Sequence, residues 1–209
     1  LRLRFNAVPV DQPGRYFYLR DRQDGDYWSA SWQPVGKALE QFQSICRHGT
    51  AYTVIESTYH GVKAVATYFV PLGQQFEYWQ LKVTNESERV RQLSIFTFCE
   101  FTNQWITEQD QVNLQYSTFI VKGGLTGDNL LRIAIHDNLR HSQGSDAPMH
   151  SWMGLVGAPV SGYDTSREAF LGPYRGYHNP QVVEVGQCQG SEAYGDNACG
   201  VMQVDLQLA

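Results

Sequence analysis

Apolar and polar residues alternate with a period of two along much of this chain, the spacing of a β-strand that buries one face. The alternation is clearest where Val62, Ala64, Ala66 and Tyr68 share one face and the residues between them share the other. The pattern predicts strands at 15–20, 27–28, 52–57, 62–70, 76–84, 90–101 and 130–135, and the alternation returns at 201–208. Helical periodicity is scarce, so the fold class is predicted to be all-β.

Short polar turns connect the predicted strands. Asp24-Gly25-Asp26 predicts a hairpin after the first strand, and His60-Gly61 predicts a second hairpin. The polar turn at 85–88 predicts that the strands on its two sides pair as neighbours in an antiparallel meander. Strands and turns at this regular spacing are typical of a large antiparallel β-sandwich, and we expect residues 1–209 to form one such domain.

Other segments are less regular. Residues 109–117 are predicted to form a loop or a short helix. A later stretch is rich in Gly, Pro, Tyr and Arg, and within it Ser166 is placed to cap a short helix that ends at Leu171. Glu168 would lie in the first turn of this helix, where a carboxylate is favourable.

Composition and charge exclude several classes of protein. The chain is 42% hydrophobic and 18% charged, which is typical of a folded domain. Its net charge is −5 and no stretch concentrates Lys or Arg, which argues against a nucleic-acid or anionic-membrane surface. Its apolar runs are far shorter than the roughly 20 residues that span a bilayer. Both termini interrupt strand-like patterns, so we expect a fragment of a longer protein.

The four cysteines are Cys46, Cys99, Cys188 and Cys199, and none belongs to a CxxC pair of the kind that binds zinc. Cys99 lies in an apolar strand and is predicted to be a buried free thiol. Cys188 and Cys199 could face each other across a hairpin, which leaves a disulfide open. Sparse cysteines favour a reducing compartment, and we expect a cytoplasmic protein.

Residues able to do chemistry are present, but no catalytic motif joins them. The six histidines lack the spacing of a metal site on one element, and no nucleophile elbow, P-loop or dinucleotide motif occurs. We therefore expect no metal site. The carboxylates in aromatic, Gly-rich surroundings are expected to cap helices or organise turns; they are Asp110, Asp164, Glu168 and Asp196.

Three segments are more polar and aromatic than a core requires. Trp28 and Trp32 could stack on a sugar, although sealing one end of the sandwich is the favoured interpretation. Residues 46–49 are predicted to be a loop before a strand, with Gly49 where a side chain would be blocked. Residues 110–116 carry amides that could reach a ligand or a neighbouring subunit.

Several motifs follow one another along nearly the whole chain: Arg15-Tyr16-Phe17-Tyr18-Leu19-Arg20-Asp21, Trp28-Ser29, Ser31-Trp32-Gln33-Pro34, Arg47-His48-Gly49, Tyr68-Phe69-Val70-Pro71-Leu72-Gly73, Asp164, Arg167-Glu168, Phe170-Leu171-Gly172 and Asn179-Pro180. In this order they resemble the N-terminal region of the cellobiose phosphorylase-like enzymes of glycoside hydrolase family 94. The resemblance implies a galactose-mutarotase-like β-sandwich, or supersandwich, at the N-terminus of an enzyme whose (α/α)6 barrel lies outside this chain.

The resemblance also implies a reaction. In inverting phosphorolysis, inorganic phosphate attacks the anomeric carbon of a β-linked disaccharide while an Asp protonates the leaving oxygen. The products are an α-sugar 1-phosphate and the second sugar, and phosphate is a co-substrate, so no cofactor is expected. The general acid and the phosphate-binding residues would belong to the barrel. No catalytic residue is therefore expected in this chain.

Substrate-binding residues are implied as well. Members of the family are typically homodimers in which the sandwich of one subunit approaches the active site of the other, through a segment that resembles 110–117. Asn113 and Gln115 match the family's Asn and Gln, but Tyr116 stands where cellobiose phosphorylases have Arg. A Tyr offers one hydroxyl in place of several fixed donors, which casts doubt on cellobiose and makes cellobionic acid and chitobiose candidates. Asn113, Gln115 and Tyr116 are thus the predicted substrate-binding residues.

Two other functions remain open from the sequence. A stand-alone carbohydrate-binding sandwich would use Trp28 and Trp32 and would bind sugar as an isolated chain. A mutarotase-like enzyme would need a histidine and a carboxylate aligned in a groove, and neither His136 nor His178 has an evident partner in the sequence.

Overall fold

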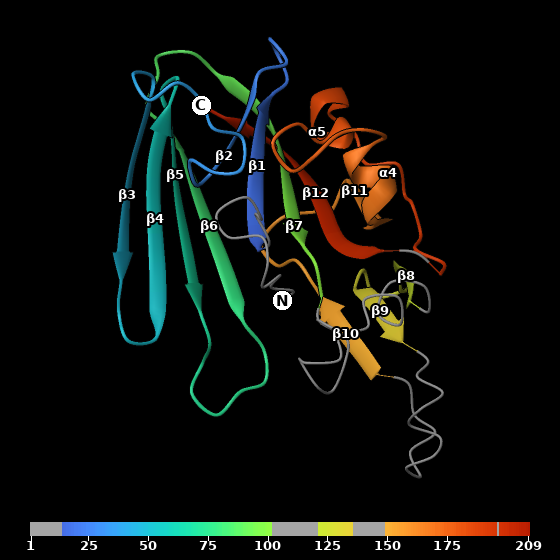
Figure 1. The fold of residues 1–209 in the computed structure, drawn as a ribbon. Helices are drawn as coiled ribbons and strands as arrows, with labels where there is room; N and C mark the ends of the chain where they lie inside the picture. Colours follow the sequence, from blue (N-terminus) through green and yellow to red (C-terminus); the bar gives the residue numbers. More distant parts are fainter. Residues whose placement is uncertain (1–13, 102–120, 136–148, 196) are drawn as a thin grey trace, which may run out of the picture.

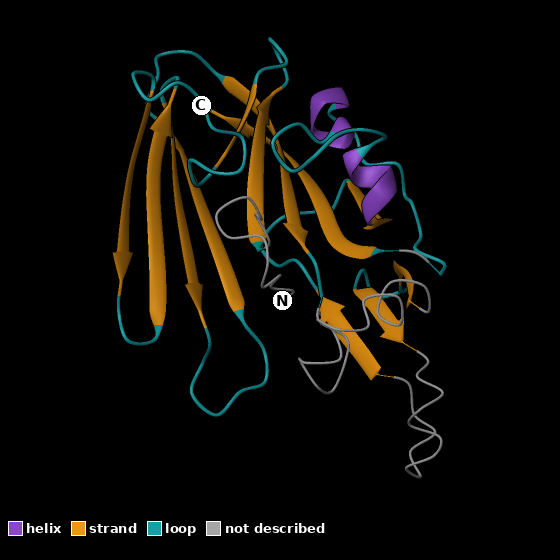
Figure 2. Cartoon of the chain, viewed as in Figure 1, coloured by secondary structure: helices purple, strands orange, loops and turns teal. Residues whose placement is uncertain are grey.

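A computed structural model describes residues 14–101, 121–135, 149–195 and 197–209 (Figure 1). Antiparallel strands dominate these residues, as the sequence predicts (Figure 2). One sheet has the order β3 (Phe42–His48), β4 (Tyr52–Tyr59), β5 (Val62–Phe69), β6 (Tyr78–Asn85). A second has the order β11 (Gly162–Ser166), β12 (Ala198–Leu208), β7 (Arg91–Cys99), β1 (Arg15–Asp21), β2 (Tyr27–Ser29). A small third sheet has the order β10 (Met149–Met153), β9 (Leu131–Ile135), β8 (Val121–Leu125).

The five-stranded sheet lies between the four-stranded sheet and the short helices α4 (Arg167–Leu171) and α5 (Gln181–Val185) (Figure 1). Strand β1 shows how the five-stranded sheet contributes side chains to a core on each of its two faces. Phe17 and Leu19 enter the core shared with the four-stranded sheet, whereas Tyr16 and Tyr18 enter the core beneath the helices. The period of two therefore supplies two hydrophobic cores from one strand.

The two predicted hairpins are confirmed. Strands β1 and β2 pair antiparallel, and β4 pairs with β5 across the His60-Gly61 turn. The alternation in β5 is confirmed, since Val62, Ala64, Ala66 and Tyr68 are buried and the residues between them are only partly covered. The two faces differ because only one side of the four-stranded sheet meets a core.

The predicted meander between 76–84 and 90–101 is wrong. Strand β6 is an edge of the four-stranded sheet, whereas β7 lies between β1 and β12 in the other sheet. Strand β7 is buried on both faces, since Ile95 packs toward the four-stranded sheet and Phe96 toward the helices. A strand that is apolar on both faces needs cover on both sides, which a place between the two cores provides.

Strand β3 corrects a second prediction. Residues 46–48 form the end of this edge strand and are not a loop. Their side chains are exposed and polar, so no alternation of apolar and polar residues marks this part of the strand in the sequence. The prediction for Gly49 is confirmed, because a Cβ at this position would collide with the ring of Tyr52.

The short helix predicted after Ser166 is also confirmed as α4. The Ser166 hydroxyl accepts a hydrogen bond from the Ala169 N–H at 3.3 Å, and Glu168 lies in the first turn. Strands β8, β10 and β11 and helix α5 were not anticipated. None of the described helices is long and apolar enough to cross a membrane.

All four cysteines are free thiols. Cys99 is buried, as predicted. The disulfide left open between Cys188 and Cys199 does not form, although both side chains belong to the core beneath the helices. Sharing a core brings two cysteines into one region without giving them the narrow Cβ geometry that a disulfide requires.

Candidate functional site

The predicted substrate-binding residues Asn113, Gln115 and Tyr116 lie outside the described residues. The structure describes the two ends from which their segment extends. Strand β7 ends at Cys99 and is followed by Glu100 and Phe101, and β8 begins at Val121. The described residues around these two ends are therefore the part of the candidate site that the structure shows.

Glu100 is the centre of a buried polar network at the end of β7. Its side chain is only 4% exposed, and its Oε1 accepts a hydrogen bond from Arg167 Nε at 2.7 Å. The Tyr177 hydroxyl donates to the same carboxylate oxygen, while Arg167 Nη2 donates to the Tyr177 oxygen at 3.1 Å. The network joins the end of β7 to the first residue of α4 and to the loop before α5.

The charges of this network are mutually supporting. Burial lowers the pKa of Arg167, but the Glu100 carboxylate and Tyr177 outweigh it, and the net pKa is raised. Burial and the charge of Glu100 raise the pKa of Tyr177 to about 12. The phenol therefore stays protonated at neutral pH and continues to donate to Glu100.

Aromatic rings enclose the network. The Phe98 ring lies 5.0 Å from Phe170 and 5.5 Å from Tyr177, measured between ring centroids. The hydroxyl of buried Tyr18 donates to the Tyr177 carbonyl at 2.8 Å. These contacts fix the helical layer against β1 and β7, so the point at which the 102–120 segment begins is rigidly supported.

Close backbone packing supports both ends of the segment. A Cβ at Gly200 of β12 would lie 2.9 Å from the ring of Phe101 and 2.9 Å from the sulfur of Met153. A Cβ at Gly123 of β8 would lie 2.8 Å from Ile133 and 2.9 Å from Thr165. Glycine allows the neighbouring strands to approach this closely.

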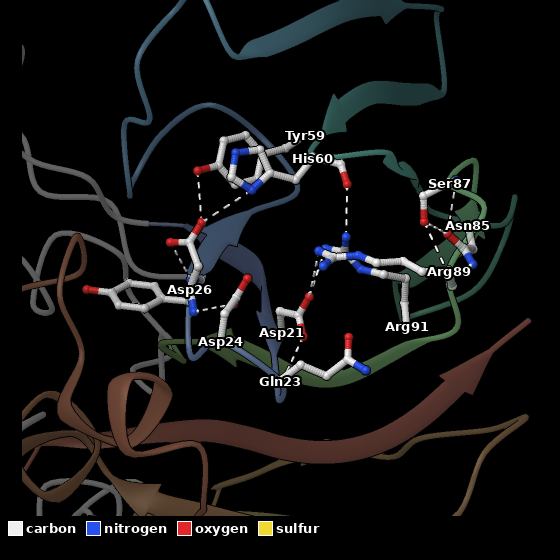
Figure 3. Close-up of polar contacts among 11 residues, drawn as sticks. Asp21, Gln23, Asp24, Asp26, Tyr59, His60, Asn85, Ser87, Arg89 and Arg91 are labelled. Atoms are coloured by element: carbon white, nitrogen blue, oxygen red, sulfur yellow. Dashed lines mark hydrogen bonds and ion pairs between the residues drawn. The ribbon is translucent and has the colours of Figure 1, made fainter.

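A second polar network joins the two large sheets at another end of the domain (Figure 3). Arg91 Nη2 lies 2.8 Å from Asp21 Oδ2, and both side chains are almost fully buried. The two charged groups form a buried ion pair. Arg91 Nη1 also donates to the His60 carbonyl at 3.1 Å, which ties β7 to the β4–β5 turn.

Asp26 lies in the β1–β2 turn and provides a second link to the β4–β5 turn. It accepts hydrogen bonds from Lys37 and from the Tyr59 hydroxyl, the latter at 2.9 Å. His60 Nδ1 lies 3.8 Å from Asp26 Oδ2, and the His60 ring stacks on Tyr59 (Figure 3). This histidine–carboxylate pair was not predicted, because the two residues lie 34 positions apart in different turns. Both carboxylate oxygens are already engaged, so the arrangement is a structural link between turns.

The chain matches a known protein family over its whole length. Residues 1–209 match the family described as glycosyl hydrolase 94, supersandwich domain. The chain belongs to this family. Both the family resemblance and the antiparallel β-sandwich predicted from the sequence are thereby confirmed.

Relatives of this supersandwich domain are phosphorylases. It is 37% identical over 207 residues to N,N'-diacetylchitobiose phosphorylase of Vibrio proteolyticus, a match that covers 99% of this chain and 25% of that protein. It is 34% identical to N,N'-diacetylchitobiose phosphorylase of Vibrio furnissii, over 95% of this chain and 24% of the relative. It is 32% identical to solabiose phosphorylase of Paenibacillus borealis, over 93% and 24%. The chain thus spans about a quarter of the length of these relatives.

Two carboxylates of the supersandwich domain were predicted to have local structural roles. Asp164 is fully buried, and its Oδ1 accepts hydrogen bonds from the Ser191 N–H at 2.9 Å and the Ser191 hydroxyl at 2.6 Å. This confirms that it organises a turn. Exposed Glu168 caps α4 electrostatically and borders a shallow groove of about 370 Å³ with Gln181 and Gln189. Asp110 and Asp196 lie outside the described residues.

The two tryptophans considered for sugar stacking both pack in or against a hydrophobic core. Trp28 is 1% exposed and belongs to the core between the large sheets. Trp32 packs against the same core, and its indole N–H donates to the Lys37 carbonyl at 2.7 Å. The interpretation in which these rings seal the sandwich is confirmed, and neither ring supports a stand-alone sugar-binding module.

Proposed function

We propose that this domain is the N-terminal part of an inverting disaccharide phosphorylase and that it borders the active site through residues 110–117. Membership of the glycosyl hydrolase 94 supersandwich family carries the proposal. The general acid and the phosphate-binding residues lie in another domain, and this chain contributes none of the catalytic groups. Inorganic phosphate is the co-substrate, and the reaction uses no cofactor.

N,N'-diacetylchitobiose is the proposed first substrate. Two relatives that share 37% and 34% identity with this chain are phosphorylases of that disaccharide. Tyr116 is consistent with this choice, since it replaces the Arg of cellobiose phosphorylases. A phenol can pack against an N-acetyl group and donate one hydrogen bond, whereas a guanidinium presents several fixed donors.

A homodimer is the proposed assembly, in which residues 110–117 of one subunit approach the second sugar in the active site of the other. The Glu100–Arg167–Tyr177 network and the glycine packing at Phe101 hold the base of the segment. A fixed base is what a segment needs if it is to position Asn113, Gln115 and Tyr116 at a neighbouring site. Four free cysteines support a cytoplasmic location.

The test is phosphate-dependent release of a sugar 1-phosphate by the full-length protein. Separate reactions would contain N,N'-diacetylchitobiose, cellobionic acid or cellobiose, each with and without phosphate. We expect N-acetylglucosamine 1-phosphate from the first, only when phosphate is present, and none from the isolated 209-residue chain. Release of free sugar without phosphate, or no turnover of any β-linked disaccharide, would contradict the proposal.

A further inference from the structure

Three side chains converge on the edge strand β3, away from the networks described above. Cys46 and His48 are two residues apart and share one face of the strand. Cys46 Sγ lies 3.4 Å from His48 Nε2, within hydrogen-bond distance for sulfur. The other ring nitrogen, His48 Nδ1, lies 2.9 Å from Thr53 Oγ1, on the residue directly opposite His48 in β4.

The arrangement orients the imidazole toward the thiol. When Nδ1–H donates to Thr53 Oγ1, Nε2 carries the free lone pair and can accept the proton of Cys46. A thiolate is the reactive form of cysteine, and a neighbouring imidazole that accepts the proton promotes its formation. The contact between Cys46 and His48 is thus of the type that makes a thiol nucleophilic.

Exposure distinguishes Cys46 from the other cysteines. Cys46 is exposed, whereas Cys99, Cys188 and Cys199 are buried. Burial raises the pKa of the Cys99 thiol to about 12 and raises the pKa values of Cys188 and Cys199 as well. The three buried thiols therefore stay protonated and shielded at neutral pH, and only one cysteine of the chain combines access with a proton acceptor.

A metal site is the weaker explanation of the same pair. Within the described residues, no three His, Cys, Asp or Glu side chains gather as ligands for one ion. Two ligands on an exposed strand leave a metal half-coordinated, whereas thiol chemistry requires only the groups that are present.

We propose that Cys46 is a site of thiol oxidation by hydroperoxides, with His48 as the proton acceptor and Thr53 as the residue that positions it. His48 Nε2 takes the thiol proton, and the sulfur attacks one peroxide oxygen. An S–O bond forms as the O–O bond breaks, and the departing hydroxide takes the proton from His48 and leaves as water. Sulfur is oxidised to the sulfenic acid and the peroxide is reduced, so that one thiol and one hydrogen peroxide give one sulfenic acid and one water.

The oxidised residue has a defined fate. The other three cysteines are buried, so none is available to form a disulfide with it within the chain. A small thiol such as glutathione would cap the sulfenic acid as a mixed disulfide, which a reductant reverses. This inference is independent of the phosphorylase proposal.

The test is the rate of sulfenic acid formation in the full-length protein. Hydrogen peroxide would be added in the presence of a cyclic 1,3-diketone probe, and labelling would be followed by mass spectrometry of the tryptic peptide 38–47, which contains Cys46 alone among the cysteines. We expect Cys46 to be labelled before Cys99, Cys188 and Cys199. His48→Gln should slow its labelling by about tenfold or more, since it removes the base. Thr53→Val should slow it less.

A matched control separates the role of His48 from simple exposure. The double variant Ser44→Cys with Cys46→Ser moves the thiol two residues along the same face of β3, to another exposed position farther from His48 and within the same tryptic peptide. We expect it to react as slowly as the His48→Gln variant. The proposal is overturned if the relocated thiol reacts as fast as Cys46, if His48→Gln has no effect, or if Cys46 is not labelled.

Discussion

The buried pair of Asp21 and Arg91 leads to a prediction about stability. Asp21→Asn preserves the side-chain oxygen that accepts the Gln23 N–H but leaves the Arg91 charge without its partner. We expect a loss of about 3–5 kcal/mol in the free energy of unfolding. Arg89→Gln is the control, because Arg89 lies 3.9 Å from Asp21 and its side chain is 59% exposed; a change below about 1 kcal/mol is expected. Urea unfolding measures both, and equal losses would refute the assignment.

Single residues show why part of the site could not be predicted. Glu100 is hydrogen-bonded to Arg167, which lies 67 positions further along the chain, and to Tyr177, which lies 77 positions further. The sequence around Glu100 does not indicate these partners, since a charged residue after an apolar strand usually marks a strand end. Ser166 is the opposite case. Its hydrogen bond to Ala169 joins residues three positions apart, and short-range capping rules predicted it correctly.

The contacts of Asp26 predict that the free energy of unfolding depends on pH. Burial raises the pKa of its carboxyl, but the hydrogen bonds from Lys37 and Tyr59 lower it more, and the net pKa falls below the ordinary 3.8. A carboxyl with a lowered pKa in the folded state stabilises the protein above its unfolded pKa, and this contribution is lost as pH falls through the folded value. Asp26→Asn should therefore reduce stability at pH 6 and make little difference well below pH 3.8. Unfolding at the two values measures the effect, and a loss of equal size at both would be inconsistent with it.

At the scale of elements, local patterns identified strands but not their sheets. The alternation of β5 and β6 was identified correctly, because along each of these strands one set of alternate side chains is less exposed than the other. Strand β7 was identified as a strand and then assigned to the wrong neighbour. Its turn with β6 looks like an ordinary hairpin connection, and only the second core beneath the helices explains why it crosses to the other sheet.

The approach of β8 to its neighbours can be tested by a single methyl group. Gly123→Ala would place a Cβ 2.8 Å from Ile133 and 2.9 Å from Thr165, and we expect a loss of about 1–3 kcal/mol in unfolding free energy. The control is Gly127→Ala, since a Cβ there meets nothing within 4 Å. We expect the control to be neutral or slightly stabilising. Denaturant unfolding of the two variants distinguishes close packing from a general intolerance of alanine in this turn region.

At the scale of the whole molecule, the predicted substrate-binding residues can be tested in the full-length protein. If the proposed role of this segment holds, the combined substitutions Asn113→Ala, Gln115→Ala and Tyr116→Ala in the full-length protein should change the ratio of kcat/KM values between two acceptor sugars by about tenfold or more, because the proposed polar contacts to the second sugar would be removed. Synthesis from sugar 1-phosphate measures the ratio directly. Gln74→Ala with Gln75→Ala is the control, since both amides are exposed on the β5–β6 connection. An unchanged acceptor ratio in the triple variant would show that the segment does not contact the second sugar.

The position of β12 has a consequence for how the domain is made. This strand is the last in the chain, yet it lies between β11 and β7, and its Asp205 accepts a hydrogen bond from Ser94, 111 positions earlier. A ribosome synthesises β7 long before it synthesises β12, so one edge of β7 is without its partner while about a hundred residues emerge. The five-stranded sheet is therefore completed late, when β12 pairs with β7 and β11. Until β12 emerges, that edge of β7 is open to pairing with another chain, the hazard that chaperones guard against during synthesis.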